Sequence, residues 1–241
     1  MAALSLKIRK ALFALLRPKC WAALSRGVAP SSEHLSALRK MSCDRIIDVG
    51  ANKGQFSLIA RIFDPTVPIE AFEPQPEEAS IYRKIFRLDP YVKLHEVALG
   101  GKPGKSDLHI SRRRDSSSLL PIGELQAKLF ENTEEIGTHQ VQVLTLDEFS
   151  SAWADSQRML LKLDVQGFEL EVLRGAESFL RRCAYVYAEC SEVALYTGQA
   201  LFPEVKLFLG ARGFRHVQSF NEQYSNGSLI QADHLFERLR S

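Results

Sequence analysis

The amino-acid sequence predicts an α/β protein with a doubly wound, mostly parallel sheet that is covered by helices on both faces. From Asp44 onward, short apolar runs of strand length alternate with segments of helical length, a pattern typical of parallel strands joined by crossover helices. The chain has 241 residues, of which 45% are hydrophobic. This is enough for one large core or at most two small ones. Since no internal repeat divides the pattern, we expect a single domain over residues 41–241.

Residues 1–40 are expected to form a separate N-terminal segment. Its first 32 residues contain six basic side chains and no acidic one. Apolar residues recur there at helical spacing, at Leu4, Ile8, Leu12 and Leu15. This spacing predicts a basic amphipathic helix within residues 4–17. In order of preference, the helix packs on the domain, lies on an anionic membrane surface, or serves as an organellar presequence.

The first half of the domain is expected to contain three strands and two helices. The first strand reads RIIDV and has the apolar character of a buried strand. The second helix starts with a proline followed by Glu77 and Glu78, all of which suit a helix N-terminus. In chain order, the predicted elements are a strand at Arg45–Val49, a helix at Gln55–Phe63, a strand at Pro68–Phe72, a helix at Pro76–Leu88 and a strand at Tyr91–Val97.

The alternation is interrupted after residue 100 and then resumes. Two short extra strands, Ser106–Ser111 and Gln140–Leu144, flank a polar loop. The buried series continues with a strand at Met159–Leu163, a helix from about Phe168, a strand at Tyr185–Glu189 and a helix near Pro203–Ala211. Two last strands, Phe214–Gln218 and Ser228–Ala232, are expected to close the fold as an antiparallel pair.

Acidic residues recur at the ends of the predicted strands. Ligands of a doubly wound sheet bind outside the carboxyl ends of its strands, so these side chains are candidates for a site. A bland alternative is that strand ends face water and tolerate charge. The acids are Asp48, Glu73, Glu96, Asp164 and Glu189.

The turn after the first strand, in the stretch IIDVGANKGQFS, indicates the class of ligand. Its pattern is DxGxxxG, with Asp48, Gly50 and Gly54, and not the GxGxxG of a dinucleotide site. An acid before the turn would repel a pyrophosphate but would pair with an ammonium group. Glu73 follows at the spacing of a carboxylate that binds ribose hydroxyls. An amino acid joined to adenosine without phosphate describes S-adenosylmethionine.

Five stretches resemble the FkbM family of S-adenosylmethionine-dependent methyltransferases in matching order. They are IIDVGANKGQFS, AFEPQP, EVALGG, VLTLDEF and LLKLDVQGFELEVLRGAESFL, between about Arg45 and Glu189. The resemblance implies the class I methyltransferase fold, a three-layer Rossmann-like structure whose seven-stranded sheet has six parallel strands and one antiparallel strand. It also implies O-methylation of hydroxyl groups, often on sugars, glycolipids or polyketides.

The resemblance further implies a set of cofactor-binding residues. The turn from Asp48 to Gly54 would hold the methionine part, Glu73 the ribose, and Glu96 to Leu99 would border the adenine. The full set is Asp48, Gly50, Ala51, Asn52, Gly54, Phe56, Glu73, Pro74, Glu96, Val97, Ala98, Leu99 and Asp164. Gln166 stands where the family more commonly has Glu, so a mechanism that requires an acid at this position is not supported.

The chemistry requires a group that orients the acceptor hydroxyl or removes its proton, because the sulfonium is already an activated donor. Asp164 is the first candidate, with Glu169 and Glu189 as second choices. A carboxylate is a weak base unless burial raises its pKa. Glu169 is equally well interpreted as a helix N-terminal charge. We expect no metal ligands, although a divalent cation between Asp164 and Glu189 is a minor alternative.

Other features restrict the partners. A formal net charge of +2 and DVQG in place of a base-stacking (Asp/Asn)-Pro-Pro-(Tyr/Phe) motif argue against nucleic acid. Four cysteines without CxxC pairs predict reduced thiols and a cytoplasmic location. The expected partner is a small molecule or glycan with a hydroxyl group, with membrane contact through residues 4–17 as an addition. The alternatives are a cofactor-binding module without catalysis and an oxidoreductase that uses NAD.

Three further patterns are interpreted conservatively. Residues 100–106 (GGKPGKS) imitate a phosphate-binding loop, but position 99 is Leu where that motif has Gly. The run Arg112–Arg114 with Ser116–Ser118 is expected to be a solvated face, with substrate contact as the alternative. Three histidines near the predicted site are expected to be structural: His95, His109 and His139.

Overall fold

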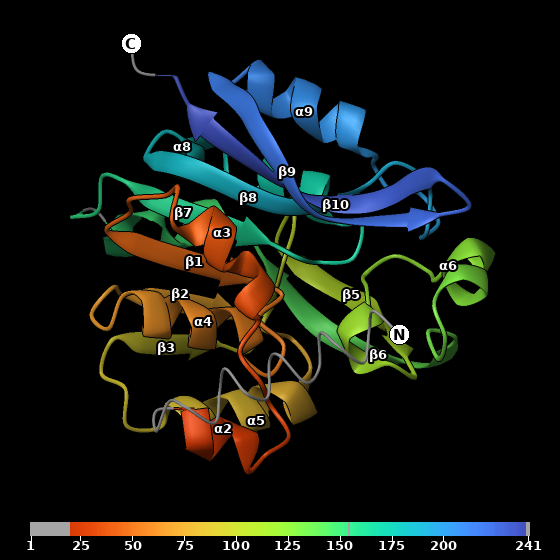
Figure 1. Cartoon of the computed structure of the whole chain (residues 1–241), viewed down its shortest axis with the longest axis horizontal. Helices are drawn as coiled ribbons and strands as arrows, with labels where there is room; N and C mark the ends of the chain where they lie inside the picture. Colours follow the sequence, from red (N-terminus) through yellow and green to blue (C-terminus); the bar gives the residue numbers. More distant parts are fainter. Residues whose placement is uncertain (1–19, 154, 240–241) are drawn as a thin grey trace.

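The computed structural model describes residues 20–153 and 155–239, which form a three-layer α/β fold (Figure 1). A seven-stranded sheet in the order β3-β2-β1-β7-β8-β10-β9 is the central layer. Its strands are β1 (Arg45–Val49), β2 (Ile69–Phe72), β3 (Val92–His95), β7 (Met159–Leu163), β8 (Cys183–Ser191), β9 (Phe214–Ser225) and β10 (Ser228–Arg238). The predicted fold class is confirmed. The helix predicted within residues 4–17 lies outside the described residues and stays a prediction.

Six strands of this sheet run in one direction and one runs against them. β1 pairs in parallel with β2 and β7, and β3 and β8 extend the parallel set on either side. β10 is antiparallel to both β8 and β9, so β9 has the direction of the parallel set. The expected six parallel strands and one antiparallel strand are therefore present.

Helices cover both faces because neighbouring residues of a buried strand point to opposite sides. Ile46 packs with α3 (Leu35–Leu38) and α4 (Gln55–Phe63), whereas Ile47 packs on the opposite face. The first face also carries α2 (Trp21–Leu24) and α5 (Pro76–Phe86). The second face carries η4 (Leu146–Trp153), α7 (Glu169–Arg174), α8 (Glu177–Leu180) and α9 (Phe202–Gly210). Both sides of each central strand are thereby removed from water.

A second, three-stranded sheet differs from the predicted strands. It has the order β4-β6-β5, with β4 (Ala98–Leu99), β5 (Gly104–Ser111) and β6 (Glu135–Leu144). The strand predicted at Tyr91–Val97 is wrong at its carboxyl end, because β3 stops at His95 and the chain then crosses into this second sheet. β6 starts earlier than predicted, since its exposed first half is held by pairing with β5.

Short helices occur in segments where none was predicted. η3 (Arg114–Ser116) and α6 (Glu124–Leu129) interrupt the polar loop between β5 and β6, and η2 (Ser32–His34) precedes α3. Each has six residues or fewer, too few to establish a helical period in the sequence. In the part of the chain that the structure describes, no helix has the length and apolar character needed to cross a bilayer.

Candidate functional site

A cavity of about 330 Å³ lies at the carboxyl ends of β1, β2, β7 and β8. Its floor is the glycine turn after β1 and its walls are the segments that follow β2, β3 and β7. The segment between β5 and α6, η2 and the hairpin of β9 and β10 complete the lining. This is the edge of the sheet at which the sequence predicts a site.

The glycine turn is held tightly against the end of β7. Gly50 has φ +74°, and a Cβ atom there would lie 1.8 Å from the carbonyl oxygen of Asp164. Gly54 has φ +93° and begins α4, where a Cβ atom would lie 2.6 Å from the ring of Phe86. Both positions therefore require glycine. The cavity is lined by Gly50, Ala51, Asn52 and Phe56, whereas Gly54 serves the packing of the turn.

Asp48 does not occupy the position predicted for it. It is fully buried, accepts a hydrogen bond of 2.7 Å from the Ser57 hydroxyl, and lies 3.2 Å from Nζ of Lys162. Asp48 is not among the described residues that line the cavity. The expected pairing of Asp48 with a ligand ammonium is therefore wrong, because a lysine of the protein already supplies the positive charge.

Lys162 is a cavity residue that the sequence analysis missed. Its Nζ also donates a 3.3 Å hydrogen bond to the carbonyl of Gly50 and lies 3.6 Å from Oδ2 of Asp164. Burial by itself lowers the pKa of Lys162, but the carboxylates of Asp48 and Asp164 raise it above its ordinary value. The available signal was a single lysine within the buried strand MLLKL, where a charge requires a partner.

Glu73 and the segment after β2 form the next part of the wall. The Glu73 carboxylate accepts hydrogen bonds from the backbone N–H groups of Asn52 at 2.7 Å and Gln75 at 2.8 Å. Burial raises the pKa of Glu73 to about 7, although these N–H groups lower it. Each carboxylate oxygen has capacity for a further hydrogen bond. Glu73 and Pro74 both line the cavity.

The predicted adenine wall is present only in part. Val97, Ala98 and Leu99 line the cavity. Glu96 does not line it, because its side chain is exposed and forms a 2.9 Å ion pair with Arg83 on α5. The predicted contact of Glu96 with a cofactor is therefore corrected: the strand ends at His95, two residues earlier than predicted, and the Glu96 side chain turns outward.

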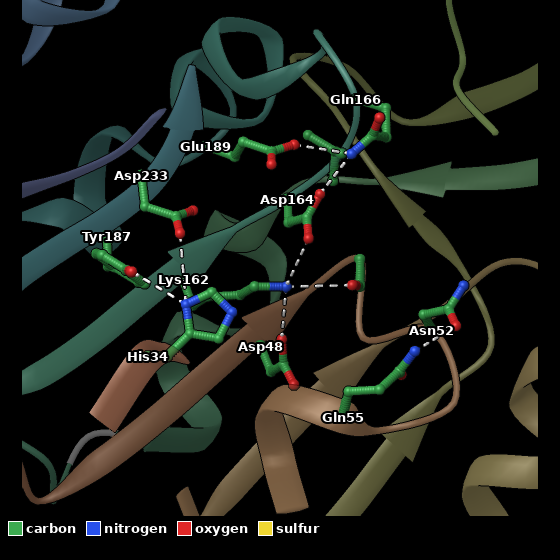
Figure 2. Close-up of polar contacts among 12 residues, drawn as sticks. His34, Asp48, Asn52, Gln55, Lys162, Asp164, Gln166, Tyr187, Glu189 and Asp233 are labelled. Carbon is green, nitrogen blue, oxygen red and sulfur yellow. Dashed lines mark hydrogen bonds and ion pairs between the residues drawn. The ribbon is translucent and has the colours of Figure 1, made fainter. Parts of the chain in front are cut away.

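Asp164, Gln166 and Glu189 form a hydrogen-bonded row across the ends of β7 and β8 (Figure 2). Nε2 of Gln166 donates to Oδ1 of Asp164 at 2.7 Å and to Oε2 of Glu189 at 2.9 Å. Its Oε1 accepts a hydrogen bond of 2.8 Å from the hydroxyl of Tyr196. Burial raises the pKa of Glu189 well above its ordinary value, and the nearby Asp164 and Asp233 raise it further. The amide of Gln166 thus separates two carboxyl groups at the centre of the cavity.

Glu169 has a structural position and does not face the cavity. Its buried carboxylate accepts N–H bonds from Val165 at 3.1 Å and Gly167 at 3.2 Å. Burial raises the pKa of Glu169 to about 7, whereas these backbone bonds lower it. Because both acceptor bonds go to the loop that contains Gln166, Glu169 fixes that loop. These two contacts give Glu169 a structural role, so the prediction of Glu169 as a catalytic base is corrected.

The polar loop after β5 closes one side of the cavity. Arg113, Arg114 and the serines at 116–118 line it. The expected solvated face is present only in part: Arg112 and Arg113 are exposed and pair with Glu134 and Asp115 at the surface. The hydroxyl of Ser118 donates a 2.7 Å hydrogen bond to the carbonyl of Gln166. This loop is thereby connected to the central row.

The far end of the cavity contains residues that had no motif in the sequence. Nδ1 of His34 lies 3.0 Å from the hydroxyl of Tyr187 and 3.4 Å from Oδ2 of Asp233 (Figure 2). It also lies 3.2 Å from Nδ2 of Asn221. His34, Asn221 and Asp233 line the cavity, together with Gln223 and Gln231. They come from η2, β9 and β10, segments that only the folded chain brings together.

The three histidines expected to be structural lie away from the cavity. His95 bonds to Glu70 at 2.7 Å and His109 bonds to Glu135 at 2.9 Å. His139 is exposed on β6. Within residues 20–153 and 155–239, no group of three or more His, Cys, Asp or Glu side chains has the arrangement of a metal site.

Comparison with known proteins places this chain among methyltransferases. Residues 48–216 match the model of the methyltransferase FkbM domain. Methyltransferase 1 of Beauveria bassiana is 31% identical over 147 residues, covering 55% of this chain and 58% of that protein. The 2-O-methyltransferase NoeI of Sinorhizobium fredii is 27% identical over 160 residues, covering 64% and 66%. The chain thus spans less than two thirds of the length of either relative.

Solved structures also superpose on the chain. The precorrin-6y C5,15-methyltransferase of Geobacter metallireducens has 14% sequence identity and a TM-score of 0.46, over 86% of this chain and 85% of that one.

The strand order and the cavity beside the glycine turn define a doubly wound, Rossmann-like cofactor-binding domain. The family match extends over more than half of the sequence. The chain belongs to the FkbM methyltransferase family.

The methyl donor of this family is S-adenosylmethionine, and the residues present fit it. Gly50 leaves room for close approach to the backbone of the turn. Glu73 supplies acceptors for two hydroxyl groups, and the segment 97–99 supplies an apolar wall. Asp164 is 38% exposed and lines the cavity, so a carboxylate remains for an ammonium group.

Proposed function

We propose that this protein transfers the methyl group of S-adenosylmethionine to a hydroxyl group of a carbohydrate, a glycolipid or a related polar metabolite. The observation that carries the proposal is one cavity with two unlike ends. The glycine turn and Glu73 form one end, and side-chain amides and carboxylates line the other. Groups of this second kind exchange hydrogen bonds with neutral polyols. A relative named as a 2-O-methyltransferase supports an oxygen acceptor.

The contacts around the cavity indicate which residues would hold the donor. Because Lys162 neutralises Asp48, we assign the ammonium group of the methionine part to Asp164. The ribose hydroxyls are assigned to Glu73, and the adenine to Val97 and its neighbours. The donor supplies an activated methyl group when bound. The protein therefore has to align the acceptor oxygen, exclude competing water and provide a destination for the hydroxyl proton.

The row of Asp164, Gln166 and Glu189 lies between the two ends of the cavity. We assign these side chains to orienting the donor and the acceptor hydroxyl. Gln166 suits this role better than an acid would, because its Nε2 donates to both neighbouring carboxyl groups. A third carboxylate at position 166 would replace these two attractions with repulsion.

The experiment that tests the proposal uses methyl-labelled S-adenosylmethionine and a combined lipid and glycan extract. We expect the wild-type protein to transfer label to a product that resists mild alkali, because an ether survives conditions that hydrolyse a methyl ester. Asp164→Asn should abolish transfer and weaken the binding of S-adenosylhomocysteine at least tenfold, or about 1.4 kcal/mol, because it removes the charge assigned to the ammonium group. Label in alkali-sensitive products, or turnover retained by Asp164→Asn, would contradict the assignment.

A further inference from the structure

A polar cluster around His34 forms the far end of the cavity. The cluster consists of His34, Tyr187, Asn221 and Asp233, and all but Tyr187 line the cavity. His34, Asn221 and Asp233 lie outside residues 48–216, the part of the chain that matches the family model. Three of the four members of the cluster are therefore not covered by the family match.

One nitrogen of the His34 ring is engaged and the other is available. Nδ1 faces Oδ2 of Asp233 at 3.4 Å and the hydroxyl of Tyr187 at 3.0 Å. In Figure 2 the second ring nitrogen points away from both groups. Among the described residues, none forms a hydrogen bond with Nε2. A histidine whose Nδ1–H bonds to a carboxylate presents Nε2 as a proton acceptor.

Packing fixes the orientation of this ring. His34 makes edge contacts with Phe56 of α4 at 5.4 Å and with Tyr187 of β8 at 5.7 Å between ring centroids. The amide of Asn221 donates a 2.6 Å hydrogen bond to Oδ2 of Asp233 and thereby holds the carboxylate in place. Although burial raises the pKa of Asp233, hydrogen bonds from His34, Asn221 and Tyr187 lower it overall. The carboxylate is thus kept charged beside the imidazole.

The cluster is continuous with the central row of the cavity. Asp233 on β10 and Glu189 on β8 are register partners of neighbouring strands. Gln231, two residues before Asp233 on the same strand, donates a 3.1 Å hydrogen bond to Oε1 of Glu189. His34 therefore faces the same space as the row of Asp164, Gln166 and Glu189, at the polar end.

We propose that His34 is the general base for the acceptor hydroxyl and that Asp233 is its positioning residue. This inference rests on the proposed function. The acceptor oxygen forms a bond to the methyl carbon while the carbon–sulfur bond breaks and leaves its electron pair on sulfur. The hydroxyl proton passes to Nε2 of His34, and the carboxylate of Asp233 stabilises the resulting imidazolium. The acceptor is a neutral polyol, because the surrounding groups at this end are mainly amides and carboxylates.

The groups that face His34 determine how transfer depends on pH. Asp233 from β10 and Tyr187 from β8 are the titratable groups in contact with it, and Glu33 is its neighbour on η2. α4 and β9 present the uncharged Phe56 and Asn221. We expect transfer to rise with pH, because only the neutral imidazole accepts the hydroxyl proton.

The test compares His34→Asn with Asp233→Asn and with the matched control His139→Asn. Asparagine at position 34 retains a donor near the place of Nδ1 but lacks Nε2. We expect His34→Asn to lower transfer to the extract at least 100-fold and to remove this rise of transfer with pH. Asp233→Asn should lower transfer by at least tenfold, and His139→Asn should match the wild type. Calorimetry should give dissociation constants for S-adenosylhomocysteine within twofold in all variants.

A second measurement does not depend on an acceptor. Nitrogen-15 NMR of imidazole groups in the protein loaded with S-adenosylhomocysteine should show His34 with its proton on Nδ1, and Asp233→Asn should change this tautomer ratio. A proton on Nε2 of neutral His34, or transfer by His34→Asn above one third of the wild-type rate, would overturn the proposal. If the wild type transfers no label at all, the proposed function fails, and the tautomer still decides whether His34 presents a free Nε2.

Discussion

At the scale of single residues, the pairing of Lys162 with Asp48 decides how the site is used. The sequence placed Asp48 before the glycine turn, where it suited a cationic ligand. In the folded chain Lys162 lies on the neighbouring strand β7, directly beside Asp48 in the strand register. That neighbour is 114 positions away in the sequence, so no local motif could have indicated the pairing. The ligand ammonium is thereby left to Asp164.

The buried pair predicts a large and non-additive effect on stability. Lys162→Met should lower the free energy of unfolding by about 3–5 kcal/mol, because it leaves the buried Asp48 carboxylate without its cation. The double variant Asp48→Asn with Lys162→Met should recover much of this loss. Urea unfolding at pH 7 measures all four members of the cycle. Additive effects of the two substitutions would show that the pair is not coupled.

Two buried glutamates predict how stability depends on pH. The pKa of Glu73 and of Glu169 is raised to about 7 in the folded protein, so each binds its proton more tightly there than in the unfolded chain. The free energy of unfolding should therefore fall as pH rises from about 4.5 to 7, by at most roughly 3 kcal/mol for each group. Glu169→Gln keeps an oxygen acceptor for Val165 and Gly167 and should flatten this slope. Urea unfolding between pH 4.5 and 8 checks it, and an unchanged slope in the variant would contradict the cause given.

At the scale of secondary-structure elements, the sequence was informative where a segment has a strong period. β1 and α4 have the predicted bounds, because their apolar residues alternate or recur at a clear spacing. The segments around the acceptor end carry no such signal. η2 is only three residues long, and Asn221 and Asp233 lie on a hairpin whose polar and apolar side chains follow no regular alternation. Their meeting with His34 depends on tertiary packing alone.

The loop after β5 is an element whose position could not be predicted, since its arginines and serines have the composition of a solvated turn. Ser118→Ala should loosen this loop, because it removes the hydroxyl that donates to the carbonyl of Gln166. We expect about fivefold weaker binding of S-adenosylhomocysteine, or about 1 kcal/mol, and faster amide hydrogen exchange in residues 112–119. Ser178→Ala on α8 is the matched control. Equal exchange rates in wild type and Ser118→Ala would show that this bond does not hold the loop.

At the scale of the whole molecule, the strand order brings one end of each parallel strand to a common edge. The acidic residues predicted at this edge have different environments, which are set by the groups around each of them. Glu73, Asp164 and Glu189 line the cavity, Asp48 is neutralised beneath it, and Glu96 is paired at the surface. Sequence position alone could not make this distinction, because burial and pairing arise only when the sheet has formed.

We propose that the cavity binds an adenosine-containing methyl donor through Glu73 and excludes a dinucleotide. Isothermal titration of S-adenosylhomocysteine and of NAD into the wild type and Glu73→Ala tests it most directly. We expect S-adenosylhomocysteine to bind the wild type with a stoichiometry of about one per chain, Glu73→Ala to weaken that binding at least tenfold, or about 1.4 kcal/mol, and NAD to show no binding. Uptake of NAD by a wild-type protein that ignores S-adenosylhomocysteine would contradict the account.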